Sequence, residues 1–249
     1  MASGKLRLDA ALLAGGFFET VEKAARAVMA GEVFVDGQAA SKPGTPVARD
    51  AALTLAARDK FVGRGGLKLE AALDHFGVSP AGLVAEDIGA STGGFTDCLL
   101  QRGSIMVHAV DVGRGQLHWR LRQDPRVRIR EGVNARFLMP EDLSPQPSLA
   151  VGDVSFISLT VILPAVFRLL PPSADAIFLI KPQFEAPRGS VAPGGVLRND
   201  DLRRACVQKI RDFTERTGHV WIGHIESPIT GRDGNVEYLA HMKRSAAVA

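Results

Sequence analysis

Seven short apolar segments alternate with helical stretches from Leu83 to the end of the chain. Each has the length of a strand, and together they cover residues 84–88, 105–110, 127–129, 149–151, 177–180, 220–225 and 238–242. Strands that alternate with helices form a mostly parallel sheet with helices on both faces. We therefore predict an α/β domain, in which ligands bind beyond the carboxyl ends of the strands.

The first fifty-odd residues follow a different pattern. Leu8, Leu12 and Leu13 have helical spacing, and a second helix that starts at Val21 ends near Gly31. Short strands around an Asp-Gly turn come next and indicate a hairpin. We predict a small α+β domain at residues 1–59 and a glycine-containing linker at residues 60–66. A larger domain, which starts with a helix, follows at residues 67–249.

Composition excludes several classes of protein. With 249 residues, of which 46% are apolar and 23% charged, the chain can form one large core plus a small domain. The N-terminus has no apolar signal segment, and the most apolar segment, residues 159–163, is interrupted by Pro164 and too short to span a bilayer. We expect a cytoplasmic protein with no membrane partner, and a monomer by default. Cys98 and Cys206 lack the spacing of metal ligands, so we expect reduced thiols and no metal.

Basic residues are concentrated in one part of the larger domain. The net charge is only +3, but residues 102–136 contain eight Lys or Arg and three Asp or Glu. Such a segment fits a phosphate-binding surface, and it also fits a solvated face with no ligand. Both interpretations stay open from composition alone.

The segment from Asp87 to Asp97 reads DIGASTGGFTD and lies between two apolar segments. Glycines there let the backbone turn sharply out of a strand and approach a ligand closely. Asp111 follows at the end of the next apolar segment, and an acidic residue about 20 positions after such a turn can bind ribose hydroxyls. The pattern predicts a nucleoside-cofactor site, although a plain strand-to-helix connection can look the same.

Charged residues follow three of the other predicted strands or lie beside them. Asp153 and Lys181 each follow an apolar segment, and Glu237 comes at the start of the last one. All three can converge on the sheet edge that carries the Gly-rich turn. A lysine directly after four apolar residues is unusual, because lysines are rarely buried without a partner. A structural ion pair of Lys181 with Asp153 or Glu237 is the alternative to a catalytic role.

Blocks of motif residues run nearly from end to end of the chain. They are residues 7–9, 31–37, 42–44, 64–70, 87–97, 109–113, 115–117, 153–159, 181–185 and 227–229, with Gly234, Asn235 and Glu237. In order and spacing they resemble the TlyA family of ribosomal RNA methyltransferases, whose members are often labelled hemolysins. The larger domain also resembles the wider FtsJ group of 2′-hydroxyl methyltransferases.

This resemblance implies a Rossmann-like methyltransferase fold with a small N-terminal RNA-binding domain. It implies a Lys-Asp-Lys-Glu tetrad, carried here by Lys68, Asp153, Lys181 and Glu237. It also implies S-adenosylmethionine as cofactor, with the ribose hydroxyls on Asp111 and the other contacts from Gly89, Ala90, Ser91, Thr92, Gly93, Gly94, Phe95, Val112, Asn134 and Asp153.

The small domain resembles an RNA-binding module of a small-subunit ribosomal protein, of pseudouridine synthases and of some tRNA synthetases. The implied partner is ribosomal RNA or a ribosomal subunit, held by its phosphates and shape. We expect the contacts to come from exposed basic side chains of both domains: Arg7, Lys23, Arg26, Lys42, Arg64, Arg114, Arg120 and Arg122.

The chemistry of the implied reaction can be argued separately. A sulfonium methyl is already activated, so the protein must align the acceptor and relieve it of its proton. A lysine serves as a base only where burial and a second cation lower its pKa. Our hypothesis is that Lys181 is the base or stabilises the developing alkoxide, while Lys68 positions the ribose. The alternatives are an RNA-binding ribosome-assembly factor without catalysis, a membrane-active hemolysin and, for the Gly-rich turn alone, a dehydrogenase.

Overall fold

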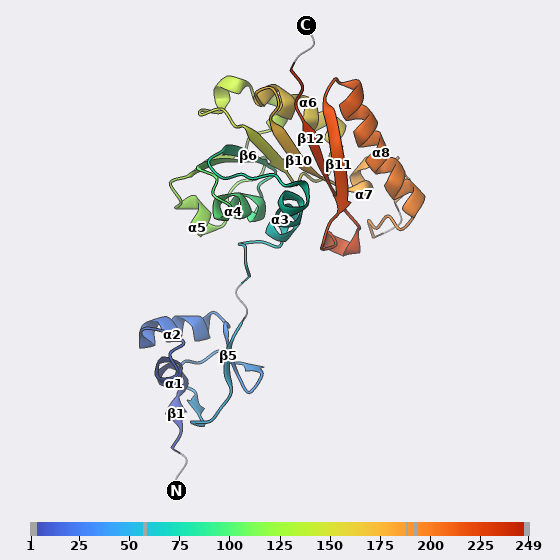
Figure 1. Cartoon of the computed structure of the whole chain (residues 1–249). Coiled ribbons are helices and arrows are strands. Elements are labelled where there is room, and N and C mark those ends of the chain that lie inside the picture. Colours follow the sequence, from blue (N-terminus) through green and yellow to red (C-terminus); the bar gives the residue numbers. More distant parts are fainter. Residues whose placement is uncertain (1–3, 57–58, 188, 192–193, 247–249) are drawn as a thin grey trace. The chain divides into compact units, whose positions relative to one another are not determined.

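The computed structural model describes residues 4–56, 59–187, 189–191 and 194–246. The chain divides into two compact units, Met1–Asp59 and Lys60–Ala249 (Figure 1). Each unit has a hydrophobic core of its own.

The smaller unit is built from two helices and short antiparallel strands. Its elements are β1 (Leu6–Arg7), α1 (Leu8–Ala14), α2 (Val21–Met29), β2 (Val33–Val35), β3 (Gln38–Ala39), β4 (Pro46–Val47) and β5 (Leu53–Leu55). The hydroxyl of Thr20 accepts a hydrogen bond from the N–H of Lys23 and so caps α2. Asp36 and Gly37 both have positive φ, which suits the two-residue turn between β2 and β3. Apolar side chains of both helices pack with β2 and β4, so the predicted α+β fold is confirmed.

The larger unit contains a mixed sheet with helices. In chain order, its first elements are α3 (Gly65–Phe76), β6 (Val84–Ile88), α4 (Gly94–Gln101), β7 (Met106–Asp111), α5 (Trp119–Arg122), β8 (Val127–Glu131), η1 (Ala135–Phe137), η2 (Pro140–Asp142) and β9 (Leu149–Gly152). The remaining elements are α6 (Leu159–Leu169), β10 (Asp175–Ile180), α7 (Pro182–Glu185), α8 (Asp200–Arg216), β11 (Val220–Glu226), η3 (Arg232–Gly234) and β12 (Tyr238–Lys243). Strands therefore form where the seven apolar segments predict them.

The strand order in the described residues of this sheet is β11-β12-β10-β9-β6-β7-β8. Neighbours from β10 to β8 pair in parallel, while β12 is antiparallel to both β10 and β11. The order reverses between β6 and β9, because the chain first builds outward to β8 and then returns to the other side of β6. Such a switch point is where open α/β sheets bind ligands. The predicted Rossmann-like, mostly parallel sheet is confirmed.

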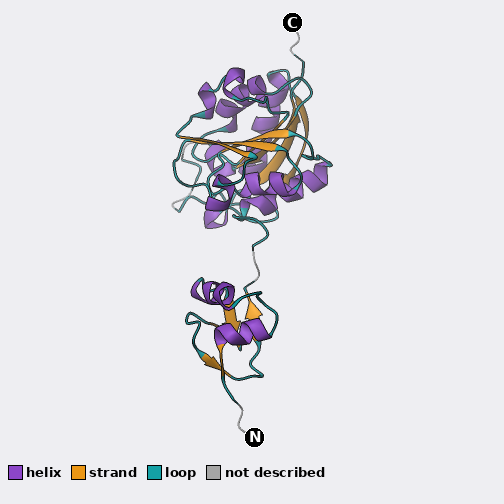
Figure 2. Cartoon of the chain, turned by 90° about the vertical axis from the view of Figure 1, so that its left-hand side faces the viewer, coloured by secondary structure: helices purple, strands orange, loops and turns teal. Residues whose placement is uncertain are grey.

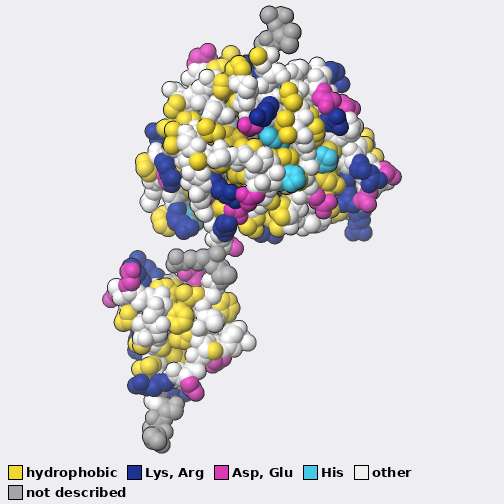
Figure 3. Space-filling model, in the orientation of Figure 1, with side chains coloured by type: hydrophobic (Ala, Val, Ile, Leu, Met, Phe, Trp, Pro, Cys, Tyr) yellow, Lys and Arg dark blue, Asp and Glu magenta, His cyan; other side chains and the backbone are white. Residues whose placement is uncertain are grey.

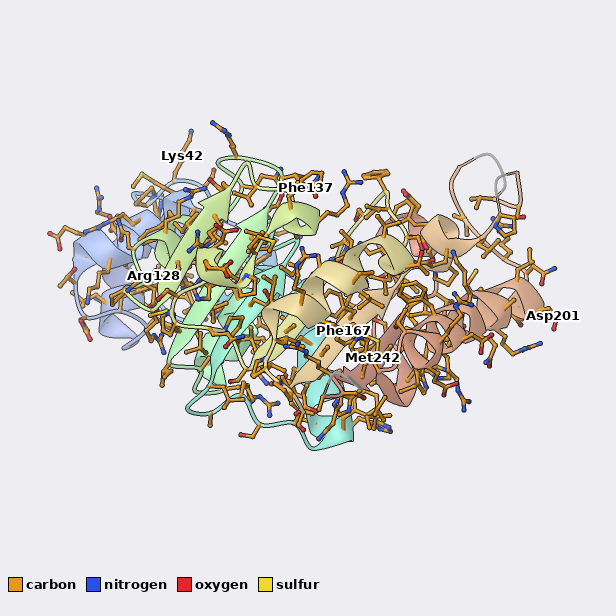
Figure 4. The ribbon with its side chains drawn as sticks, turned by 90° about the horizontal axis from the view of Figure 1, so that it is seen from above. Lys42, Arg128, Phe137, Phe167, Asp201 and Met242 are labelled. Atoms are coloured by element: carbon orange, nitrogen blue, oxygen red, sulfur yellow. The ribbon has the colours of Figure 1, made fainter. Side chains whose placement is uncertain are left out.

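Helices cover both faces of the sheet (Figures 1 and 2). α3 and α4 pack on one face with side chains such as Leu69 and Leu99, while α6 and α8 pack on the other. Figure 4 labels Phe167 of α6 and Met242 of β12, which both belong to the core cluster that contains residues of α6 and α8. The core therefore lies in two layers, and the sheet edge formed by the carboxyl ends of the parallel strands is left for loops.

Residues 60–66, which the sequence suggests as a linker, pack on the larger unit. Phe61 is buried in the cluster beneath α3 and α4, and the N–H of Val62 donates to the carboxylate of Asp97 at 2.8 Å. Gly66 is already part of α3, and a Cβ at this position would come within 2.3 Å of the Phe61 ring. The glycines here therefore serve a close approach of chain segments within the unit.

Candidate active site

A large cavity lies at the switch point of the sheet. Its volume is about 1010 Å³, and its lining includes residues from the carboxyl ends of β6, β7, β9 and β10 together with the loop before β12. Because β12 runs antiparallel to β10, its first residues lie at the same edge as the last residues of the parallel strands. The fold therefore brings together segments that are up to about 170 residues apart in the sequence.

The Gly-rich turn forms one wall of this cavity and connects β6 to α4. Gly89 has a φ of +82°, and a Cβ there would lie 2.9 Å from the carbonyl oxygen of Asp153, so only glycine fits. The N–H groups of Ser91 and Gly113 donate to the two carboxylate oxygens of Asp111 at 2.8 and 2.7 Å. These bonds fix Asp111 at the cavity wall and leave lone pairs on both oxygens for the hydroxyls of a ligand.

The structure brings most of the predicted cofactor residues to this wall. The large cavity is lined by Gly89, Ser91, Asp111, Val112, Asn134 and Asp153. A second cavity of about 180 Å³ is lined by Gly89 and Ser91 as well, and it adds Ala90, Thr92, Gly94 and Phe95. Gly93 is in the lining of neither. A Cβ at Gly93 would meet the side chains of Leu121 and Leu117, so its role is to let the turn pack against the α5 region.

Four charged side chains that line the large cavity meet one another. Lys181 Nζ lies 2.5 Å from Asp153 Oδ1, and Lys68 Nζ donates to Glu237 Oε2 at 2.6 Å. Lys68 Nζ is also 3.8 Å from Asp153 Oδ2. Positive and negative groups therefore alternate in the order Lys181, Asp153, Lys68, Glu237. The tetrad residues that the resemblance implies are in contact with one another in the structure.

This group of charges is largely removed from water. Lys68 is 7% exposed and Glu237 is 3% exposed, and the four formal charges sum to zero. Burial of charges is tolerable only when each is paired and hydrogen-bonded. The backbone also makes room for the group, since a Cβ at Gly231 would lie 2.2 Å from Glu237 Oε1. Taken alone, this geometry fits both a structural ion-pair network and a catalytic site.

Basic residues predicted to bind RNA are spread over both units. In the smaller unit Arg7, Lys23, Arg26 and Lys42 are exposed, and the Arg7 guanidinium lowers the pKa of Asp9 through a hydrogen bond. The larger unit contributes the other four predicted residues. Arg64 lines the large cavity, Arg114 and Arg120 are exposed, and Arg122 pairs with Glu131 and lowers the pKa of that carboxyl to about 2. On the face of the larger unit shown in Figure 3, Lys and Arg side chains lie in several separate groups.

Two residues of the site were not assigned a role from the sequence. Ser155 accepts a hydrogen bond from Lys181 Nζ at 2.7 Å, so it is a direct partner of a tetrad residue. Phe156 lines the cavity although its side chain is 90% exposed, and its φ of +64° is rare for a non-glycine residue. Both lie in a motif block, but a phenylalanine in such a block is equally typical of a buried core.

A doubly wound sheet with a Gly-rich turn and an acidic residue at its switch point is typical of Rossmann-like nucleoside-binding domains, a class that includes methyltransferases. The model for the FtsJ-like methyltransferase family matches residues 61–244, and the S4 domain model matches residues 6–52. The chain belongs to the FtsJ-like methyltransferase family, with an S4 domain at its N-terminal side. It is therefore a methyltransferase, and S-adenosylmethionine is its methyl donor.

Relatives of known name extend over nearly the whole chain. YqxC of Bacillus subtilis, described as a candidate rRNA methyltransferase, is 47% identical over 97% of this chain and 87% of its own length. The 16S/23S rRNA (cytidine-2′-O)-methyltransferase TlyA of Mycobacterium tuberculosis is 43% identical, over 96% of this chain and 90% of its own. A solved structure from Streptococcus thermophilus, described as a candidate hemolysin, is 43% identical, covers 99% of this chain and 90% of its own, and has a TM-score of 0.75.

In the described part of the chain, no group of three or more His, Cys, Asp or Glu side chains is placed to hold a metal ion. Within the same residues, no helix has the length and apolar content needed to span a bilayer.

Proposed function

We propose that this protein transfers the methyl group of S-adenosylmethionine to a ribose 2′-hydroxyl of ribosomal RNA, and that Lys68, Asp153, Lys181 and Glu237 carry out the reaction. The observation that supports this most directly is their alternating ion-pair chain in the lining of the same cavity that Asp111 lines. The name of the M. tuberculosis relative, a cytidine-2′-O-methyltransferase of rRNA, agrees with this substrate.

The residues present fit S-adenosylmethionine. Asp111 offers two anchored carboxylate oxygens for ribose hydroxyls, and the bare backbone at Gly89 leaves space beside Asp153. Asn134 uses its side-chain oxygen to cap η1, which leaves its amide N–H₂ at the cavity wall for a base or an amino acid group. When bound, the cofactor supplies an activated methyl group.

Lys181 is the best placed of the four side chains to meet the substrate. An ammonium group has three N–H donors. One is donated to Ser155 Oγ, Asp153 Oδ1 lies 2.5 Å away as the ion-pair partner, and donor capacity is left for a ribose oxygen. We assign it the stabilisation of negative charge that develops on the 2′-oxygen, since an ammonium group offers that oxygen both a positive charge and a hydrogen-bond donor. Its partner Asp153 is the adjacent carboxylate that can receive the hydroxyl proton as the new bond forms.

Lys68 has a different task from the one the sequence suggests. Its ammonium group contacts the carboxylates of Glu237 and Asp153, so we assign it the orientation of Asp153 rather than the positioning of the ribose. Glu237, buried on the far side of Lys68, balances its charge. A chain of this kind holds Asp153 between two cations.

Recognition of the RNA would involve both units. The S4 domain presents Arg26 and Lys42 to solvent, and Arg64 reaches the cavity lining of the larger unit. An exposed aromatic side chain at the same cavity, Phe156, offers a surface on which a nucleobase can stack. A folded RNA held by its phosphates would then present one ribose to Lys181.

The experiment that tests the function is the transfer of tritium from labelled S-adenosylmethionine. Purified 30S and 50S subunits and naked ribosomal RNA are each incubated with the protein. We expect label in RNA that resists alkaline cleavage between the modified nucleotide and its 3′ neighbour, since a 2′-O-methyl group blocks that reaction. Label on a base, with normal alkaline cleavage, or no label on any of these substrates, would contradict the proposal.

Replacement of Asp111 by alanine tests the cofactor wall. We expect S-adenosylmethionine to bind at least about 10- to 100-fold more weakly, because a single hydrogen bond to a charged acceptor is worth roughly 1.5–3 kcal/mol. Isothermal titration calorimetry measures the change. The matched control is Asp74→Ala, which removes a carboxylate that pairs with Arg102 outside the cavity lining. Equal affinities for Asp111→Ala and the wild type would remove Asp111 from the cofactor site.

A further inference from the structure

Two loops carry the residues that meet the substrate, and they lie against each other. One loop, residues 153–158, connects β9 to α6, and the other segment, residues 181–185, consists of Lys181 and the short helix α7 that follows it. At one end Lys181 contacts Asp153 and Ser155, and in the middle the rings of Phe156 and Phe184 lie 5.0 Å apart. The positions of the side chains that meet the substrate therefore depend on the contacts between these two segments.

The other end of the two loops is joined by Glu185. Its side chain is 1% exposed, and its carboxylate accepts three hydrogen bonds. Ser158 Oγ donates at 2.6 Å, the N–H of Leu159 at 2.6 Å, and Lys209 Nζ at 2.8 Å. Lys209 comes from α8, and it also donates to the carbonyl oxygen of Glu185 at 3.0 Å. One buried carboxylate thus ties α7 to the first turn of α6 and to α8.

The loop held by this carboxylate is strained. Phe156 has a φ of +64° and an exposed side chain, a state that costs free energy in both respects. Such a conformation persists only where the surrounding structure enforces it. Within three residues after Phe156, Ser158 and Leu159 are both hydrogen-bonded to Glu185. The Glu185 carboxylate also lies at the N-terminus of α6, where the helix dipole favours a negative charge.

We propose that Glu185, with Lys209 as its counter-ion, is a positioning residue for methyl transfer. It holds residues 153–158 in the strained form that exposes Phe156 and keeps Asp153 and Ser155 against Lys181. This inference rests on the proposed function, because it concerns how the same site is set for its substrate. Glu185 itself is too deeply buried to touch substrate, so it acts only through these two loops.

The hydrogen-bond partners of Glu185 require a carboxylate at this position. Glutamine at this position keeps one oxygen acceptor but replaces the other with an N–H₂ donor, which would face Lys209 Nζ and Ser158 Oγ. The loop would then relax, and a displacement of about 1 Å at reacting groups can lower a rate by about 100-fold. Asp111 belongs to β7 and accepts hydrogen bonds from Ser91 and Gly113, which lie outside both loops, so its part of the cofactor wall should not be affected.

The experiment compares Glu185→Gln and Lys209→Met with the wild type and with Asp175→Asn. Asp175 is a suitable control because it is a partly buried carboxylate, paired with His241 at 2.6 Å, at the opposite end of the strand that leads to Lys181. We expect Glu185→Gln to lower kcat for RNA methylation by about 10- to 100-fold, with the Kd for S-adenosylmethionine unchanged within about twofold. Lys209→Met, an exposed site that tolerates replacement, should lower kcat by a smaller factor. Asp175→Asn should leave kcat unchanged.

Amide hydrogen exchange gives a second measurement that needs no RNA. In Glu185→Gln, the amides of residues 153–160 should exchange faster, while in Asp175→Asn they should exchange as in the wild type. If wild-type protein methylates RNA and Glu185→Gln does so equally fast, the positioning role is refuted while the function stands. If no RNA is methylated even by the wild type, the proposed function is refuted. Unchanged amide exchange of residues 153–160 in Glu185→Gln would separately refute the inference that Glu185 holds this loop.

Discussion

Replacement of Lys181 by alanine should lower methyl transfer by about 1,000-fold or more, while S-adenosylmethionine binds with nearly wild-type affinity. The loss is large because a preorganised donor at a developing oxyanion is worth roughly 10²–10³-fold alone. The alanine also leaves Asp153 without its 2.5 Å partner, which disturbs the group that would receive the proton. Single-turnover tritium transfer measures the rate, and calorimetry measures the cofactor affinity.

The matched control for this substitution is Lys243→Ala. Lys243 is a lysine at the far end of β12 whose partner, Asp175, lies 3.4 Å away and outside the cavity lining. Its loss should leave both the rate and the cofactor affinity unchanged. A drop in cofactor affinity for Lys181→Ala as large as the drop in rate would mean that Lys181 binds the cofactor, and its proposed role at the substrate would be wrong.

The strands and the switch point could be predicted from the sequence because their information is local. Apolar segments of strand length at regular intervals determine a sheet, and a polar residue directly after such a segment must lie at its carboxyl edge. Asp153 and Lys181 could therefore be placed at one edge without any structure. Asp111 could be placed for the same reason, since it ends β7.

Lys68 and Glu185 could not be found in this way. Lys68 lies on α3 in a helical segment that also contains charged residues, and there a lysine is typical of a solvated face; only the resemblance to the TlyA family indicated its role. Its burial depends on the packing of α3 beside Glu237, which is 169 residues away. Glu185 depends likewise on contacts with Ser158 and Lys209, each more than 20 residues away. The conformation of Phe156 is a tertiary property as well, because residue type favours burial and not exposure.

A glutamate buried in the sheet makes the stability of the larger unit depend on pH. Glu86 is fully buried on β6, and burial raises the pKa of its carboxyl from 4.5 to about 8. On the opposite face of the same strand, burial raises the pKa of Asp87 from 3.8 to about 7, against the effect of a hydrogen bond from Thr96. Both groups thus stay protonated in the folded protein at pH values where they ionise in the unfolded chain.

The sign of the effect follows from proton uptake. Between pH 4.5 and 8 the folded state binds more protons at Glu86 than the unfolded state, so the free energy of unfolding falls as the pH rises. Each unit of pKa difference corresponds to about 1.4 kcal/mol, so the contribution of Glu86 between pH 5 and pH 8 is about 4 kcal/mol. Replacement by glutamine removes this contribution, so the stability of Glu86→Gln should fall less over this range, by the part that Asp87 still contributes.

Urea unfolding at several pH values from 5 to 8 measures this difference. Both tryptophans of the chain, Trp119 and Trp221, lie in the larger unit, so their fluorescence follows the unfolding of that unit. Burial lowers the pKa of His108, the neighbour of Glu86 on β7. This histidine makes the free energy of unfolding rise with pH, and it does so in the wild type and in Glu86→Gln alike. The informative quantity is therefore the difference in the free energy of unfolding between wild type and Glu86→Gln.

Glu141→Gln, at an exposed position, is the control, and its free energy of unfolding should change with pH in parallel with that of the wild type. Parallel curves for Glu86→Gln and the wild type would mean that Glu86 titrates normally in the folded protein and that the sheet admits water at this position.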